Sequence, residues 1–247
     1  MAITVDIVVR SYYRDIQWLR YCLRSIDRFC NAFRQTLVVV PESCRERIHR
    51  SPLDRVETIF CPNYADDYLG QQVTKLYADT ITDADYILHV DSDCTFRVPV
   101  RPDVLLSDGR PEVMITPVEA FQRTPPWQAQ TERALGFPVK YDYLRRQPQI
   151  YPRWLYGHLR AHVRAIHGRE LTDYVLDQGP LGFSEFNALG ALAHRDYPDA
   201  FCWREWLMPD YDERFCRIHW SWGGLTAEIR NELEAILANA NEIEADR

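Results

Sequence analysis

Four short apolar runs in the first part of the chain constrain its fold more than any other feature. They are Val5–Val9, Thr36–Val40, Val56–Phe60 and Tyr86–Val90. Each is rich in β-branched or aromatic residues and too short for a buried helix, which is typical of strands inside a sheet. A proline stops the second run at Pro41 and the third at Cys61-Pro62, because proline cannot continue a central strand.

Helical patterns separate these runs. Apolar residues recur at helical spacing at Ile16, Leu19, Leu23 and Ile26, in a segment that Ser11 can begin. Gln71–Thr80 also has helical character. Strands that alternate with helices predict a mostly parallel sheet in an α/β layer structure.

Polar residues follow two of the predicted strands directly. Arg10, Ser11 and Tyr12 come after the first run, and Asp91-Ser92-Asp93 comes after the fourth. Ligands of parallel sheets gather at the carboxyl ends of the strands. We therefore expect these two groups to share one rim of the sheet.

The second half of the sequence is less regular. Prolines punctuate Thr116–Pro152, Leu155–Ile166 has a helical pattern, and Leu181–Ala193 contains Gly and aromatic residues around Ser184-Glu185-Phe186-Asn187. From Leu225 to Ile236 the pattern predicts an amphipathic terminal helix. We expect one domain over residues 1–247, with a first half to about residue 118 and an α-rich second half after it.

Composition narrows the class of protein. The 247 residues are 46% hydrophobic, enough for one substantial core. Seven Cys lie without CxxC spacing, which predicts reduced thiols in a cytoplasmic protein. We expect no signal peptide and no transmembrane segment, because no apolar stretch approaches the roughly 20 residues that span a bilayer.

Charge is unevenly distributed along the chain. The formal net charge is -7, yet residues 120–170 contain nine Lys or Arg and only three acids. This basic segment predicts an anionic partner or, alternatively, a surface on which Arg side chains pack over aromatic rings.

The strongest chemical motif is Asp91-Ser92-Asp93. Two carboxylates at i and i+2, where a strand opens into a loop, can reach one Mg²⁺ or Mn²⁺, and water and phosphate oxygens complete the shell. Such a cation neutralises a diphosphate and makes it a leaving group. The alternative is an exposed, Asp-rich turn without a ligand.

The order of several motifs resembles the GT-A-type, metal-dependent glycosyltransferases, and most closely a group of poorly characterised bacterial and phage members. The matching segments are Val5–Tyr12, Gln71–Leu76, Ala84–Asp93 and Ser184-Glu185-Phe186. The resemblance covers about residues 4–98, with islands near 181–190 and 217–224. It implies a GT-A-like, Rossmann-type sheet and transfer of a sugar from a nucleotide-diphosphate donor, expected to be UDP-linked. It also implies that residues to about 118 form the nucleotide-sugar-binding half and residues from about 119 the acceptor-binding half.

The resemblance also implies roles for single residues. Asp93 is expected to bind Mn²⁺ or Mg²⁺ directly, Asp91 to serve the metal, its water or the ribose, and His219 to complete the metal shell. The alternative for His219 is packing beside Trp220. The residues expected to contact the nucleotide or its phosphates are Arg10, Ser11, Tyr12, Gln72, Lys75, Asp91, Ser92 and Asp93.

Glu185 is the expected carboxylate on the acceptor side, and Asp91 the second candidate catalytic group. Glu185 could take the proton of the acceptor hydroxyl or stabilise positive charge on the sugar; the alternative is a surface Glu behind a helix cap. Asp177 and Asp210 are weaker rivals. His158 and His162 have metal-compatible i, i+4 spacing but no evident third ligand, so we expect a structural role.

The expected acceptor is a hydroxyl, on an anionic glycan such as a phosphorylated glycan or lipopolysaccharide, or on a hydroxylated base of phage DNA.

Two other functions are also consistent with the sequence. Asp91-Ser92-Asp93-Cys94-Thr95 also matches haloacid-dehalogenase-like phosphatases, with Asp91 as nucleophile; those proteins place the motif on their first strand and need a late acidic pair, for which Asp210 and Asp212 are the candidates. The basic segment also suits a non-catalytic module that binds carbohydrate or nucleic acid.

Overall fold

The four predicted strands form the centre of a five-stranded sheet. The computed structural model describes residues 3–50, 53, 56–121, 123, 125, 127–179, 181–208 and 210–243. In spatial order the strands are β3 (Glu57–Cys61), β2 (Thr36–Pro41), β1 (Val5–Arg10), β4 (Tyr86–Asp91) and β9 (Gln149–Pro152). The first four run parallel and β9 runs antiparallel to β4. The predicted α/β fold with a mostly parallel sheet is confirmed.

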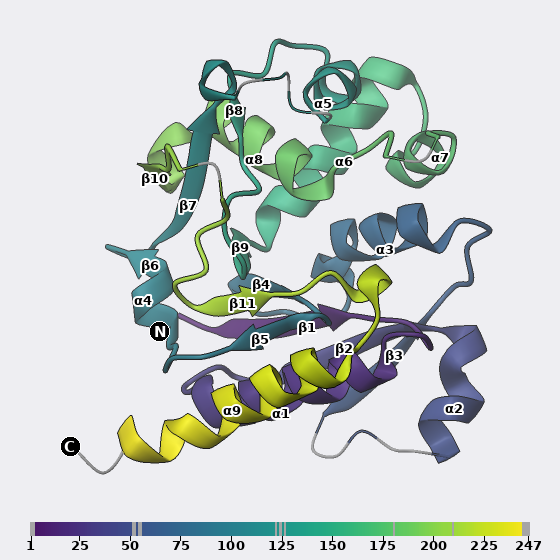
Figure 1. Ribbon diagram of the computed structural model, residues 1–247. Coiled ribbons are helices and arrows are strands. Elements are labelled where there is room, and N and C mark those ends of the chain that lie inside the picture. The colour runs from purple at the N-terminus through teal and green to yellow at the C-terminus, as the bar shows by residue number, and fades with distance from the viewer. Residues whose placement is uncertain are drawn as a thin grey trace.

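Helices cover both faces of this sheet (Figure 1). On one side lie α1 (Ile16–Phe29) and α9 (Ala227–Ile243), and on the other α3 (Asp67–Leu76), α6 (Trp154–His167) and α8 (Glu185–Asp196). Side chains alternate between the two cores, as a period of two requires: Ile7 and Val9 pack towards α1, whereas Val8 packs towards α3. The apolar runs are continuous because both faces are buried.

The second half of the chain contributes more than helices. The remaining elements of the first half are η1 (Glu42–Cys44), α2 (Arg45–Arg50), η2 (Ala78–Thr80), β5 (Cys94–Phe96), α4 (Pro102–Leu105), β6 (Leu106–Ser107) and β7 (Arg110–Pro117). Those of the second half are η3 (Val118–Ala120), α5 (Gln128–Leu135), β8 (Tyr141–Asp142), α7 (Leu171–Leu176), η4 (Pro198–Ala200), β10 (Cys202–Glu205), β11 (Cys216–Ile218) and η5 (Ser221–Gly223). β10, β7 and β6 form a small second sheet, with β8 beside β7, and β11 pairs with β5. The second half of the chain therefore has strands among its helices.

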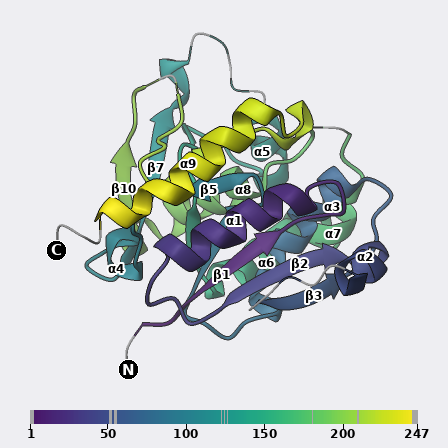
Figure 2. The same ribbon diagram turned by 60° about the horizontal axis from the view of Figure 1, so that its bottom comes forward.

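The two halves interleave. β9 extends the first sheet at β4, β11 pairs with β5, and α9 lies along α1 (Figure 2). Arg24 of α1 and Glu234 of α9 are joined by two hydrogen bonds of 2.8 and 2.9 Å. Residues from both ends of the chain therefore meet on one side of the sheet. No helix in the described part of the chain is long and apolar enough to cross a membrane.

Two helices differ from the sequence prediction. α3 begins at Asp67, before Gln71, because the Asp66 side chain accepts hydrogen bonds from the backbone N–H groups of Tyr68 and Leu69. The segment that contains Glu185 is a regular helix, α8, although it includes a glycine. A Cβ at Gly190 would lie 2.4 Å from the Tyr143 side chain, so this helix packs too closely for a larger residue.

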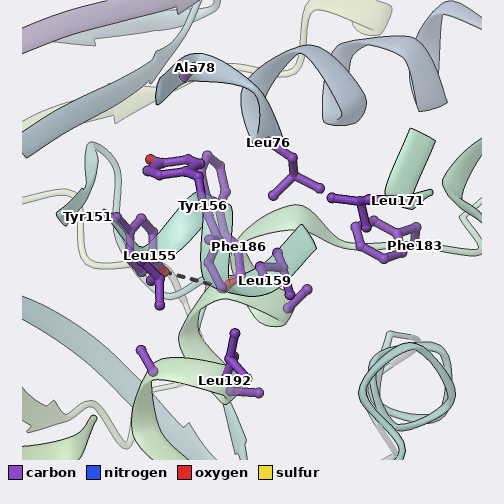
Figure 3. Packing of buried hydrophobic residues seen from close by; sticks show 14 of the residues in the cluster. Leu76, Ala78, Tyr151, Leu155, Tyr156, Leu159, Leu171, Phe183, Phe186 and Leu192 are labelled. Carbon is purple, nitrogen blue, oxygen red and sulfur yellow. Dashed lines mark hydrogen bonds between the residues drawn. The ribbon is translucent and has the colours of Figure 1, made fainter. Parts of the chain in front are cut away.

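The start of α8 is anchored in the larger of the two cores (Figure 3). Phe186 is buried, and its ring stacks 6.2 Å from that of Tyr151. The Tyr151 hydroxyl donates a 3.3 Å hydrogen bond to the Phe186 carbonyl. This packing fixes the position of the preceding residue, Glu185.

Candidate functional site

The two predicted groups meet at the carboxyl ends of neighbouring strands. Arg10 is the last residue of β1 and lies opposite Asp91, the last residue of β4. Ser92 and Asp93 form the turn that leads into β5. The expectation of one shared rim is confirmed, since β1 and β4 are parallel and in register.

A buried lysine joins two of the predicted carboxylates. Lys75, on α3, places its Nζ 2.6 Å from Asp91 Oδ1 and 2.9 Å from Glu185 Oε1. The Lys75 side chain is 4% exposed and lies over the Phe186 ring, 5.0 Å from its centroid. Burial opposes the charge, but the two carboxylates outweigh it and raise the pKa of Lys75 above its ordinary value.

Gln147 completes this arrangement, which we call the Lys75 cluster (Lys75, Asp91, Gln147 and Glu185). Its Nε2 donates a 3.1 Å hydrogen bond to Asp91 Oδ2, so both oxygens of Asp91 have partners. Gln147 is buried and its Oε1 has no hydrogen-bond partner among the described residues. Sequence reasoning missed Gln147, whose only local signal is the following proline.

A second group of acids lies on the other side of the motif. We call it the Asp93 cluster (Asp15, Asp93 and Ser221). The Ser221 backbone N–H donates to Asp93 Oδ2 at 2.9 Å, and its hydroxyl donates to Asp15 Oδ2 at 3.3 Å. Sequence reasoning also missed Asp15, an isolated acid just before α1.

The charge of the Asp93 cluster is poorly compensated. Burial and the nearby carboxylates of Asp91 and Asp15 raise the pKa of Asp93 to about 7. Burial also raises the pKa of Asp15. No Lys or Arg in the described ranges forms an ion pair with Asp93. A carboxylate held this way favours either a proton or an added cation.

His219 is linked to Asp93 through the backbone. Its N–H donates a 3.0 Å hydrogen bond to the Asp93 carbonyl. The buried ring packs on Trp18, with centroids 5.4 Å apart, rather than beside Trp220. Burial lowers the pKa of His219, which favours the neutral imidazole, and Nε2 has no partner in the part of the chain described.

Asp93 and His219 could supply some, but not all, of the ligands of a divalent cation. Across the described residues, no three His, Cys, Asp or Glu side chains are gathered so that they could hold a metal by themselves. Mg²⁺ and Mn²⁺ sites often use one or two protein ligands and take the rest from water and substrate phosphates. A half-buried Asp93 without an ion-pair partner among the described residues and a His219 Nε2 without a hydrogen-bond partner there suit that kind of site.

The other residues predicted to contact the nucleotide differ in whether they already have hydrogen-bond or ion-pair partners within the protein. Arg10 is held by Asp67, 2.5 Å away, and by the Ser11 carbonyl. The buried Ser11 Oγ and Gln72 Oε1 have no hydrogen-bond partner among the residues described. Tyr12 is half-buried beside Tyr13. Ser92 is buried in the turn.

Most of the basic segment is neutralised within the protein. Five of its Arg side chains form ion pairs: Arg145 with Asp142, Arg146 with Glu112, Arg160 with Asp79, Arg164 with Glu170 and Arg169 with Asp177. Arg145 and Arg146 are also buried. The segment therefore resembles the alternative, Arg packed over aromatic rings, more than an open anion-binding surface.

The rival residues have structural partners elsewhere. His158 bonds to the Tyr197 hydroxyl and His162 to the Leu135 carbonyl, so they do not point at one metal. Asp177 pairs with Arg169 in an exposed turn. Asp212 pairs with Arg146 and Arg214.

Comparisons with known proteins place the chain by sequence family. The model of a family of unknown function (DUF6492) matches residues 2–234. No curated protein matches the sequence. One similar solved structure is that of the glycosyltransferase GlyE of Streptococcus pneumoniae TIGR4, at 12% identity and a TM-score of 0.43. The match covers 82% of this chain and 45% of that chain, so the chain spans less than half of GlyE.

Proposed function

The chain belongs to the family of unknown function DUF6492, and from its own residues we propose that it is a metal-dependent glycosyltransferase. It would move a sugar from a nucleotide-diphosphate donor, UDP-linked by our expectation, to a hydroxyl of an acceptor. The observation that carries this proposal is the contact of Lys75 with both Asp91 and Glu185.

That contact joins residues that lie far apart in the sequence. Glu185 follows Lys75 by 110 positions, yet both carboxylates lie within 3 Å of one ammonium. The sequence motifs independently suggested Asp91 for the donor side and Glu185 for the acceptor side. A surface Glu behind a helix cap would not be buried against a lysine, so this position supports a role for Glu185 in the site.

The donor would lie across the ends of β1 and β4. Asp93 and His219 would hold the divalent cation, which when bound would neutralise charge on the diphosphate leaving group. The unpartnered Ser11 Oγ and Gln72 Oε1 offer hydrogen bonds to the nucleotide. Tyr12 offers a ring to the base. Arg10 and Lys75 already have carboxylate partners, so they would orient Asp67, Asp91 and Glu185 more than bind phosphate.

Glu185 would act where the acceptor meets the sugar. Lys75 fixes one oxygen of its carboxylate, and the packed Phe186 fixes the start of α8. A carboxylate positioned in this way can take the acceptor proton or stabilise positive charge that develops on the sugar. The first role accompanies inversion at the anomeric carbon and the second suits retention. The anomeric configuration of the product, read by NMR, separates them.

The test is turnover across a panel of nucleotide sugars, with and without Mn²⁺. We expect Mn²⁺-dependent release of a nucleoside diphosphate from one donor. Asp93→Ala should abolish it, whereas Asp103→Asn, which changes an exposed acid, should not. No metal-dependent turnover or binding of any donor would end the proposal. Metal-dependent hydrolysis of a phosphomonoester, with no use of a nucleotide sugar, would favour the phosphatase.

A further inference from the structure

Two tryptophans beside the Asp93 cluster are left open to solvent. Trp222 is 84% exposed and Trp220 is 56% exposed, although tryptophan is usually largely buried. Their ring centroids lie 6.4 Å apart at an interplanar angle of 44°, and Tyr211 packs edge-on against Trp220. We call Tyr211, Trp220 and Trp222 the aromatic shelf. Neither the proposed donor contacts nor the core uses these rings.

The shelf is tied directly to the candidate site. Ser221 lies between the two tryptophans, and its N–H and hydroxyl bind Asp93 and Asp15. This turn, between β11 and α9, lies near the tip of β1 in Figure 1. Tyr211 is close enough to Asp91 for that carboxylate to contribute to the raised pKa of Tyr211, whose main cause is burial. The rings therefore border the place where the sugar would be transferred.

The surroundings of the shelf suit a small polar ring with an apolar face. Beyond Trp222, the Cβ positions of Gly223 and Gly224 would meet no heavy atom within 4 Å among the described residues. A protein partner would need roughly 800 Å² on each side, far more than two rings offer. Ser221, between the two tryptophans, holds the carboxylates of Asp93 and Asp15 at this place, and carboxylate oxygens can accept hydrogen bonds from the hydroxyl groups of such a ring.

We propose that the aromatic shelf binds an uncharged sugar ring of the acceptor, so that the acceptor is a neutral glycan rather than an anionic one. The C–H face of the ring would lie on Trp222 and Trp220, and its hydroxyl groups would remain hydrated or bind the nearby carboxylates. The inference rests on the proposed function, because it assigns the acceptor of that same site. It replaces the anionic acceptor suggested by the basic segment, because five arginines of that segment already form ion pairs with carboxylates of the protein.

The experiment is calorimetric titration of the full chain with a panel of uncharged oligosaccharides, without donor. Trp222→Ala should weaken binding of the best glycan about five- to tenfold, and Trp222→Phe should restore most of it. The matched control is Trp154→Ala, a 41% exposed tryptophan on α6 that packs on Tyr197; its affinity should equal that of the wild type. Thermal melting of each variant confirms that it is folded.

Each variant is also titrated with UDP. Three results would overturn the assignment: no glycan of the panel binds the wild type, Trp222→Ala binds the best glycan as tightly as the wild type does, or Trp222→Ala loses affinity for UDP while it keeps its affinity for the glycan. The last would make the shelf part of the nucleotide site. Donor hydrolysis by the wild-type protein is measured separately and needs no acceptor. A protein that hydrolyses a donor but binds no glycan would sink this inference and leave the proposed function standing.

Discussion

The Lys75 cluster and the Asp93 cluster share one rim but balance their negative charge differently. In the first, a buried ammonium lies within 3 Å of both Asp91 and Glu185. In the second, Ser221 offers only neutral hydrogen bonds, and burial with the nearby acids raises the pKa of Asp93 to about 7. The fold thus supplies one cation itself, whereas the other carboxylates have only neutral partners, and we propose that they take a cation from outside.

Removal of the internal cation should have the largest effect. Lys75→Met leaves two carboxylates without their shared ammonium, which should lower the free energy of unfolding by about 3–5 kcal/mol. Urea denaturation measures this change. Lys140→Met, on the exposed second lysine of the chain, is the control and should stay within about 0.5 kcal/mol of the wild type. A similar loss in both variants would mean that the Lys75 cluster is not a charge-balanced unit.

Loss of charge at Glu185 should act on turnover more than on folding. Glu185→Gln keeps the shape of the side chain, and Lys75 keeps Asp91 as a partner, yet turnover should fall about 100-fold or more. Glu46→Gln, which alters an 84% exposed acid, serves as the control. The rate of nucleoside diphosphate release measures the turnover of both variants. Full activity in Glu185→Gln would remove Glu185 from the chemistry and leave the Lys75 cluster purely structural.

The Asp93 cluster should respond to pH in the opposite sense from an ordinary paired acid. The folded-state pKa of about 7 lies above the ordinary value of about 3.9, so ionised Asp93 costs stability. Without metal, wild-type stability should fall as the pH rises from about 4 to about 7 and then level off. Asp93→Asn should remove this fall and gain about 1–2 kcal/mol at pH 8, less than the full shift implies because Asp93 is partly exposed.

Chemical denaturation at pH 4, 6 and 8, without added cations, measures this difference. Asp103→Asn should follow the wild-type curve, because Asp103 is exposed and paired with Arg101. An Asp93→Asn variant that is less stable than the wild type at pH 8 would show that the Asp93 carboxylate is already compensated.

His219 should make the smallest difference. Its Nε2 has no described partner, so His219→Gln should leave folding nearly intact while it lowers Mn²⁺ affinity about tenfold. Calorimetry with Mn²⁺ measures the affinity. Unchanged affinity would mean that the imidazole serves only to pack on Trp18, and the Asp93 cluster would then rely on carboxylate and substrate ligands alone.

The sequence predicted the parts of this molecule that local patterns determine. Buried strands such as β1 and β4 could be predicted from their continuous apolar runs, because both faces of each strand are buried. The position of Asp91 at the end of β4 followed from that prediction. β9 and β10 were missed, since they are short and their pairing depends on distant partners. The contact of Lys75 with Glu185 spans 110 positions, so no local pattern could reveal it. Because this contact was not visible in the sequence, Lys75 was predicted to bind the phosphates of the donor rather than Asp91 and Glu185.

The Asp93 cluster shows the same limit. Asp93 followed from its motif, but Ser221 joins the cluster through two hydrogen bonds, to Asp93 and to Asp15, and Asp15 lies 206 positions from Ser221 in the sequence. The exposure of Trp220 and Trp222 is also a property of the folded surface. A count of aromatic residues cannot separate an open ring from a core ring.

The binding of Mn²⁺ in the presence of UDP tests the central claim most directly, because it asks whether the Asp93 cluster takes its cation from outside. Calorimetry should show binding by the wild type at pH 8, an affinity that falls about tenfold for each pH unit below about 7 as protons compete for Asp93, and no comparable binding by Asp93→Asn. Binding that is independent of pH and unchanged in Asp93→Asn would contradict the account.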